Sequence, residues 1–361
     1  MLIGINAIAA LKHPRTGVEE YVYQLIKHLT TLKESKKHCF VLYISDNSNF
    51  DFYLPDNFKI KCLKWPLPMW TQIRLSAEII KNKPEIFFIP VHVLPFAHPK
   101  NSVVTIHGLE YEYYPKMYPL NHLKYLRWST KYALKNARKI IAVSENTKSD
   151  LIKLYGANPD KIKVIYHGVN FVGGSPRRNT AGGLPPTIPY ILFIGRLETK
   201  KNVHGLIKAF NLLKKKYQVP HKLILAGSPG FGYDVLKLKI KNLKLEIIET
   251  GYIPEKEKML LLKKAEMFVL PSFYEGFGIP ILEAQAACCP VITSNISSMP
   301  EVAGDGAVLI NPNNIEQITE AMYKIINDNE FKKRLIQEGR QNIKRFSWQK
   351  CAQETLEILL E

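Results

Sequence analysis

Two glutamates with glycines between them form the stretch of the sequence best suited to chemistry. Glu275 and Glu283 flank Gly276 and Gly278, and the stretch follows an apolar run at 267–270. A strand, a glycine turn and a helix start leave backbone N–H groups without intrahelical partners at the carboxyl end of a sheet. Such N–H groups bind anions, whereas carboxylates accept hydrogen bonds from hydroxyls and repel bare phosphate. The stretch therefore predicts a ligand with both phosphate and hydroxyl groups, as in a nucleotide-sugar.

A second loop supplies positive charge for such a ligand. Arg196 and Lys201 follow the apolar run 190–194, and arginine offers a planar fork of donors while lysine offers a point charge. Because loops at the carboxyl ends of parallel strands share one edge of a sheet, we expect this loop beside Glu275. Arg–Lys pairs are also common on protein surfaces, and a helical glutamate is usually solvated, so the prediction depends on their convergence.

The first half of the chain has two further candidates. His107 follows the apolar run 102–106, at the strand end where open α/β sheets place ligand contacts, and Gly108 leaves the adjacent backbone open. A histidine there can also be purely structural. Gly17 precedes a stretch with helical periodicity, so its N–H group either binds a ligand or simply begins a helix.

The elements that would position these residues alternate between strand and helix patterns, which is typical of an α/β protein with parallel sheets. A chain of 361 residues is longer than a single hydrophobic core usually supports, so two domains are expected. Residues 173–186 have no apolar periodicity and predict a linker between domains 1–172 and 187–345, which would face each other across a cleft. The expected strands are 2–7, 39–45, 86–90, 102–106, 139–143, 190–194, 223–226, 246–249, 267–270, 291–293 and 307–310.

The composition indicates which classes of partner and which cellular compartment to expect. The formal net charge of +18 favours an anionic partner: nucleic acid, an acidic membrane or a phosphorylated substrate. The five cysteines have no metal-ligand spacing, and adjacent Cys288 and Cys289 are expected to be core residues in a reducing compartment. The amino terminus has no basic segment typical of a signal peptide, and no apolar run is long enough to span a bilayer. We expect a cytoplasmic protein, soluble or peripheral on the inner face of the cell membrane.

A predicted helix at 121–139 has its basic residues on one face, with aromatic residues beside them. Such a combination suits the headgroup region of an anionic membrane, although a solvated face over an ordinary core helix explains it too. The basic residues are Lys124, Arg127, Lys131, Lys135 and Arg138, and the aromatic ones are Tyr125, Trp128 and Tyr132.

Parts of the sequence are compatible with two other classes of protein, one that binds a nicotinamide cofactor and one that binds nucleic acid. Gly227, Gly230 and Gly232 follow a strand, but their spacing differs from G-x-G-x-x-G, which argues against a nicotinamide site. A non-catalytic nucleic-acid-binding α/β protein would explain the positive charge. It leaves Glu275 and Glu283 without a role, because they would repel a phosphate backbone.

With these residues identified, the chain resembles the GT4-type glycosyltransferases along nearly its whole length. The most specific match is the E-x7-E element from Glu275 to Glu283 within S-x-Y-E-G-F-G-I-P-I-L-E-A. Two positions depart from the family pattern: Gly108 stands where Asp often follows the histidine, and His167 replaces the usual Asn. Further matches are 105–107, 143–145, 167–170, 195–197, 201–202, 290–294, 299–304 and Gly306.

The resemblance implies a retaining enzyme with the GT-B fold, in which two Rossmann-like, doubly wound domains face each other and the C-terminal helix, 346–361, packs back on the first. It would transfer a hexosyl group from a nucleoside-diphosphate sugar to a glycan or glycolipid acceptor in surface polysaccharide synthesis. Similarity to mannosyl- and rhamnosyl-type transferases favours GDP-mannose. The family needs no metal or other cofactor, and the sequence has no Asp-x-Asp pair.

The resemblance also implies a role for each site residue. Glu275 would hold hydroxyls of the donor sugar and Glu283 the ribose, while Arg196 and Lys201 bind the diphosphate. His107 would lie against the transferred sugar, and Gly17 would approach the diphosphate from the first domain. Backbone groups of the glycine loop and helix start would contact the sugar and phosphate: Gly276, Phe277, Gly278 and Ile279.

Overall fold

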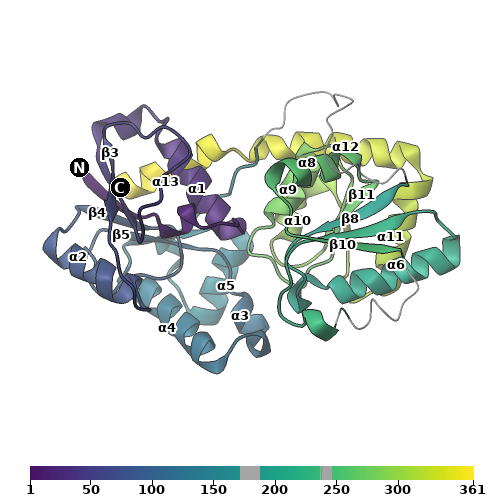
Figure 1. Cartoon of the computed structure of the whole chain (residues 1–361), viewed down its shortest axis with the longest axis horizontal. Coiled ribbons are helices and arrows are strands. Elements are labelled where there is room, and N and C mark those ends of the chain that lie inside the picture. The colour runs from purple at the N-terminus through teal and green to yellow at the C-terminus, as the bar shows by residue number, and fades with distance from the viewer. Residues whose placement is uncertain (171–187, 236, 238–245) are drawn as a thin grey trace. The chain divides into compact units, whose positions relative to one another are not determined.

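The computed structural model describes residues 1–170, 188–235, 237 and 246–361, and the chain divides into two compact units (Figure 1). The first unit comprises Met1–Gly168 with Phe346–Glu361, and the second comprises Val169–Arg345. The predicted linker, 173–186, lies outside the described residues.

Within the described residues, the first unit has seven parallel strands in the order β3-β2-β1-β4-β5-β6-β7. The order reverses between β1 and β4, and this switch point is where open α/β sheets leave room for ligands. Ile3 of β1 pairs with Phe40 on one side and Ile86 on the other, so the strand is central. The strands are β1 (Leu2–Asn6), β2 (Cys39–Ile44), β3 (Phe58–Cys62), β4 (Ile86–Ile89), β5 (Ser102–Ile106), β6 (Lys139–Ala142) and β7 (Ile162–Val164).

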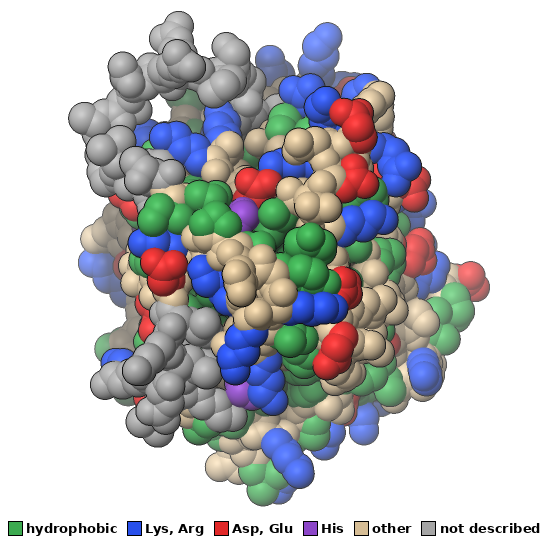
Figure 2. All heavy atoms as spheres, turned by 90° about the vertical axis from the view of Figure 1, so that its right-hand side faces the viewer, with side chains coloured by type: hydrophobic (Ala, Val, Ile, Leu, Met, Phe, Trp, Pro, Cys, Tyr) green, Lys and Arg blue, Asp and Glu red, His purple; other side chains and the backbone are tan. Residues whose placement is uncertain are grey.

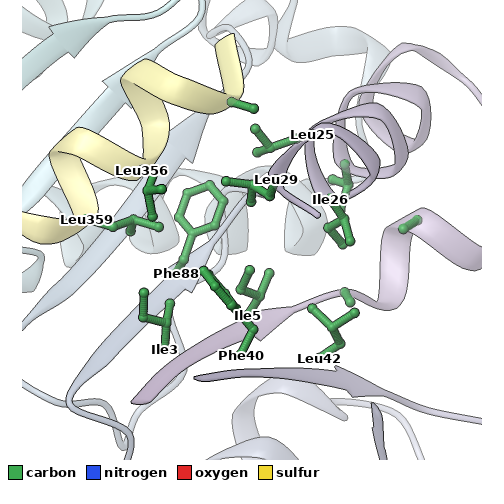
Figure 3. Packing of buried hydrophobic residues seen from close by; sticks show 14 of the residues in the cluster. Ile3, Ile5, Leu25, Ile26, Leu29, Phe40, Leu42, Phe88, Leu356 and Leu359 are labelled. Carbon is green, nitrogen blue, oxygen red and sulfur yellow. The ribbon is translucent and has the colours of Figure 1, made fainter. Parts of the chain in front are cut away.

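One face of this sheet is covered jointly by the first and last long helices of the chain. In Figure 3, Leu356 and Leu359 of the last helix lie with Leu29 of the first helix around Phe88. The helices of the unit are α1 (Gly17–Leu29), α2 (Ser76–Lys81), α3 (Glu110–Tyr113), α4 (Leu120–Asn136), α5 (Glu145–Tyr155) and α13 (Trp348–Leu360). Short helical turns are η1 (Ile8–Leu11), η2 (Glu34–Lys37), η3 (Thr71–Leu75), η4 (Pro115–Met117) and η5 (Pro159–Lys161).

The described part of the second unit has six parallel strands in the order β10-β9-β8-β11-β12-β13, with its switch point between β8 and β11. The strands are β8 (Tyr190–Ile194), β9 (Lys222–Ala226), β10 (Ile247–Gly251), β11 (Met267–Leu270), β12 (Val291–Ser294) and β13 (Val308–Ile310). Its helices are α6 (Val203–Tyr217), α8 (Glu255–Lys264), α9 (Ile279–Ala286), α10 (Met299–Ala303), α11 (Ile315–Asn327) and α12 (Asn329–Asn342). The turns are η6 (Thr199–Lys201), η7 (Gly304–Gly306) and η8 (Ile343–Arg345).

The predicted α/β class with two doubly wound parallel sheets is confirmed. The predicted helix 121–139 was wrong at its end, because α4 stops at Asn136 and Ala137 is extended. Arg138 therefore leaves the basic face, and its guanidinium donates to the Ile358 carbonyl in α13 at 2.7 Å.

Candidate functional site

The two loops of the predicted donor site meet at the switch point of the second sheet. Strands β8 and β11 are parallel neighbours, with Leu192 opposite Phe268. The loops that follow these two strands therefore begin next to each other at the same edge of the sheet. The Phe273 N–H donates to the Lys200 carbonyl at 2.8 Å and ties the two loops together. The Lys201 ammonium lies 2.6 and 2.7 Å from the two carboxylate oxygens of Glu275. The two side chains are 16% and 10% exposed, so the pair is largely shielded from water.

Serines hold Glu275 in place from two sides. The Ser272 hydroxyl donates to Glu275 Oε1 at 2.6 Å, and Ser272 is fully buried. The hydroxyls of Ser297 and Ser298, from the loop after β12, lie 2.7 and 2.8 Å from the Glu275 carbonyl. Sequence reasoning missed Ser297 and Ser298, because they stand more than 20 residues from their partner. The run of small polar residues after β12, a third strand that ends at the same edge of the sheet, was the sequence signal that could have identified them.

The glycine turn ends in the start of α9. Gly278 has a φ of 104°, and a Cβ there would lie 3.1 Å from the Ile281 side chain, so glycine is required at this position. Gly278 has no side chain to cap the helix, and the first turn of α9 has no acidic residue. The positive end of the helix dipole therefore remains at the turn that contains Phe277 and Ile279, which is favourable for an anion.

Glu283, one turn into α9, also has a lysine partner. The Lys258 ammonium of α8 lies 2.6 Å from Glu283 Oε1 and 2.7 Å from Glu255 Oε2. Burial by itself lowers the pKa of Lys258, but the charges of Glu283 and Glu255 hold that pKa above the usual lysine value. Sequence reasoning missed Lys258, since no spacing signal joins residues 25 positions apart on different helices.

Arg196 is exposed in the loop after β8, with its stem against Gly230. A Cβ on Gly230 would lie 2.7 Å from the Arg196 stem, and one on Gly227 would lie 1.9 Å from the Gly195 carbonyl. These glycines therefore allow the loops after β8 and β9 to approach each other. This close packing explains why glycine occurs at both positions, and no dinucleotide-binding motif is needed to explain it.

In the first unit, His107 lies beside the switch point of its own sheet. Its Nε2 donates to the Pro90 carbonyl, at the end of β4, over 2.7 Å. Its ring packs edge-on to Tyr21, with centroids 4.8 Å apart. Burial, and then the neighbouring His92, lower the pKa of His107 to about 3, so the ring is neutral at physiological pH.

His167, which departs from the family pattern, is a packing residue in this structure. Its ring is buried and stacks on Tyr21 at 4.6 Å and on Trp348 at 5.8 Å, so it joins α1 to α13. Burial, and then His107, lower its pKa well below the usual histidine value. A Cβ on neighbouring Gly168 would lie 2.0 Å from the Trp348 backbone, so glycine allows this close approach.

Gly17 begins α1 behind a capping box formed by Thr16 and Glu19. A Cβ at Gly17 would meet nothing within 4 Å, so the first unit alone does not require glycine there. A role in approaching a diphosphate stays a prediction.

The basic face of α4 is smaller than predicted. Lys124, Lys131 and Lys135 are exposed, but the Arg127 guanidinium is bound to Glu112 at 2.8 Å. The three predicted aromatic residues form one cluster with Phe96. Sequence reasoning missed Phe96 because it lies outside α4, in the segment between β4 and β5. The centroid distances from the Trp128 ring are 5.5 Å to Phe96, 5.7 Å to Tyr125 and 5.2 Å to Tyr132.

Neither a candidate metal site nor a helix suited to spanning a membrane is found in the described residues. Across residues 1–170, 188–235, 237 and 246–361, no group of three His, Cys, Asp or Glu side chains could hold a metal ion. Among the helices of this described part, none combines the length and hydropathy that crossing a bilayer requires. On the face shown in Figure 2, Lys and Arg lie interspersed with acidic and apolar side chains.

Two family models match the chain in succession. Residues 15–171 match the model described as Glycosyltransferase Family 4, and residues 178–342 match the one described as Glycosyl transferases group 1.

The chain is also similar to individual proteins along nearly its whole length. O-antigen chain mannosyltransferase B of Escherichia coli is 29% identical, and the match covers 98% of each chain. Among solved structures, sucrose-phosphate synthase from Thermosynechococcus elongatus superimposes with a TM-score of 0.77 at 19% identity, covering 99% of this chain and 98% of the other. Anabaena Alr3699/HepE in complex with UDP-glucose superimposes with a TM-score of 0.72 at 16% identity, covering 99% of each chain. The structural matches show a shared fold.

Proposed function

Since the chain belongs to the group 1 and family 4 glycosyltransferases, we propose that it moves a hexosyl group from a nucleoside-diphosphate sugar to a glycan or glycolipid acceptor. The observation that supports this best is the Lys201–Glu275 contact at the switch point of the second sheet, beside the start of α9. The similarity to an E. coli O-antigen mannosyltransferase favours mannose as the sugar and surface polysaccharide synthesis as the process. We propose GDP-mannose as the donor.

The arrangement suits departure of a diphosphate. Negative charge develops on the leaving group as the glycosidic bond breaks, and preorganised cations and dipoles stabilise it most strongly at that moment. Lys201, Arg196 and the start of α9 would supply them. A carboxylate has about four acceptor positions, so Glu275 can accept from a sugar hydroxyl while Lys201 and Ser272 keep their bonds.

The proposed reaction retains the configuration of the donor sugar. The acceptor hydroxyl attacks from the face that the diphosphate leaves, and the leaving phosphate oxygen accepts the hydroxyl proton. The C–O bond to phosphate breaks as the new glycosidic bond forms, so no enzyme base and no metal ion is needed in this scheme. His107 would contact the transferred sugar as a neutral ring.

A thermal-shift panel tests the donor class. A ligand that binds only the native state raises the melting temperature, so GDP, UDP, ADP and dTDP are compared with their sugars. We expect the largest shift with GDP and GDP-mannose. No response to any nucleotide, together with tight and salt-sensitive binding of RNA or DNA, would instead support a nucleic-acid-binding protein.

We also propose that the α4 face of the first unit binds an anionic membrane surface. Lys124, Lys131 and Lys135 supply positive charge, and the neighbouring cluster of Phe96, Trp128, Tyr125 and Tyr132 supplies amphipathic rings. Phe96 is 53% and Trp128 36% exposed, so both can reach the headgroup region. Each lysine near such a surface contributes about 1 kcal/mol.

Vesicle binding tests this surface. The triple variant Lys124→Gln, Lys131→Gln, Lys135→Gln should lose most binding to vesicles containing phosphatidylglycerol. A matched triple variant at exposed lysines elsewhere in the first unit, Lys59→Gln, Lys153→Gln, Lys350→Gln, should bind almost as the parent does. Equal binding by the two triple variants would remove the proposal.

A further inference from the structure

Lys258 is held between two carboxylates on the donor side of the second unit. Its side chain is 16% exposed, that of Glu283 13% and that of Glu255 62%. The better shielded contact is therefore the one with Glu283, whereas the Glu255 side chain is largely exposed. An ammonium has three donors and no acceptor, so two of them are accounted for by these carboxylates.

The position of this pair relates it to the nucleotide. Glu283 stands on α9, whose start forms the proposed diphosphate site, and Lys258 stands on α8, packed beside it. Lys258 binds the Oε1 atom of Glu283, so that oxygen has a fixed direction. A carboxylate fixed in this way offers a hydroxyl a defined acceptor, whereas a freely rotating one would lose rotamer entropy on binding.

We propose that Lys258 is a positioning residue for ribose recognition: by holding Oε1 of Glu283, it aims the carboxylate at a ribose hydroxyl of a nucleoside diphosphate. This inference rests on the proposed function, since it presumes that Glu283 meets the nucleotide. It assigns Lys258 no contact with the reacting atoms. The raised pKa of Lys258 agrees with it, because the ammonium remains charged across the pH range in which the protein would work.

The decisive measurement compares ribose and deoxyribose ligands. Dissociation constants of GDP, 2′-deoxy-GDP and 3′-deoxy-GDP are measured by calorimetry for the parent and for Lys258→Met. The parent should bind at least one deoxy analogue about tenfold or more weakly, because a buried acceptor loses its hydroxyl partner. Lys258→Met should bind GDP about tenfold more weakly and the same deoxy analogue nearly unchanged. The ratio between the two ligands would then fall toward one.

A double-variant comparison separates positioning from general damage. If Lys258 acts through Glu283, then Lys258→Met combined with Glu283→Gln should bind GDP no more weakly than Glu283→Gln alone. Additive losses would overturn the inference. The double variant also removes the isolated buried charge that could prevent Lys258→Met from folding.

A matched control breaks a similar pair elsewhere. Lys332 binds Glu266, which precedes β11 and therefore lies at the opposite edge of the sheet. Lys332→Met should lower the melting temperature but keep the parent's ratio of GDP to deoxy-GDP affinity. If the parent discriminates and Lys258→Met keeps the same ratio, this inference alone fails. If the parent binds no nucleoside diphosphate in the thermal-shift panel, the proposed function fails first.

Discussion

At the scale of single residues, the two cations predicted to bind the diphosphate differ in their surroundings. Lys201 is paired with Glu275 and mostly buried, whereas Arg196 is exposed. Substituting Lys201 affects both the stability of the protein and the candidate site, because removing one partner of a buried pair leaves the other charge uncompensated. Arg196 is therefore the cleaner probe of catalysis.

Arg196→Ala should reduce turnover about 100-fold, since a donor that stabilises transition-state charge is lost. The free energy of unfolding should change by less than about 0.5 kcal/mol, as for most exposed residues. Steady-state kinetics and urea unfolding check the two values. Arg334→Ala, at a residue on α12 whose side chain is 65% exposed, is the control and should change neither.

Lys201→Ala should lower both turnover and stability, with a loss of about 3 kcal/mol in the free energy of unfolding. Adding Glu275→Gln should restore part of that stability, because the unpaired charge is removed, but turnover should stay low. Stability restored together with full turnover would show that Lys201 acts only as a structural partner.

Sequence reasoning found Lys201, Glu275 and Glu283, because strand-end loops and a glycine turn are local signals that place residues at one edge. It did not find Ser297 and Ser298, which hold the Glu275 main chain, or the lysine that holds Glu283. Those contacts join residues on different loops or helices, and only the packed sheet brings them together.

At the scale of elements, the predictions were best where both faces of a strand are covered. Strands β5, β8 and β11 were predicted to the residue, because they are continuously buried and mostly apolar. Strands β3 and β7 were missed, since each lies at a sheet edge and alternates apolar residues with exposed lysine. The end of α4 was placed too late because lysine and arginine continue its charge pattern beyond the hydrogen-bonded turns.

The start of α6 offers a test at this scale. Asn202 has a φ of 53°, its side chain accepts from the Gly205 N–H, and its amide donates to the Pro312 carbonyl at 2.7 Å. Asn202→Ala should therefore lower the free energy of unfolding by about 2 kcal/mol, since a cap and a tolerated left-handed residue are both lost. Asn314→Ala removes an ordinary cap from α11 and should cost only about 1 kcal/mol in the same urea titration.

At the scale of the whole molecule, acid should act on the first unit through its histidines. Burial lowers the pKa values of His92, His107 and His167. An unfolded chain binds protons at these residues below about pH 6.5, while the folded chain does not, so stability is complete above that pH and is lost as the pH falls. Glu110 opposes this shift at His92 and His107 but does not reverse it.

Urea unfolding between pH 7.5 and pH 5 should show this decrease. His167→Phe keeps a ring between Tyr21 and Trp348 and should make the decrease shallower. His122→Gln, at an exposed residue on α4, should leave it unchanged. A pH dependence identical in both variants would assign the acid sensitivity to other groups.

The contribution of α13 to the core of the first unit has a consequence for how the protein is made. While the ribosome is still adding residues, the apolar face of α1 that Leu356 and Leu359 cover remains open, although residues 1–168 have already emerged. The second unit is continuous in sequence, from 169 to 345, and α13 belongs to the first unit. Domains usually complete folding in order of synthesis. Here the middle of the chain can finish before its beginning, which must wait until α13 has been synthesised and has left the ribosome.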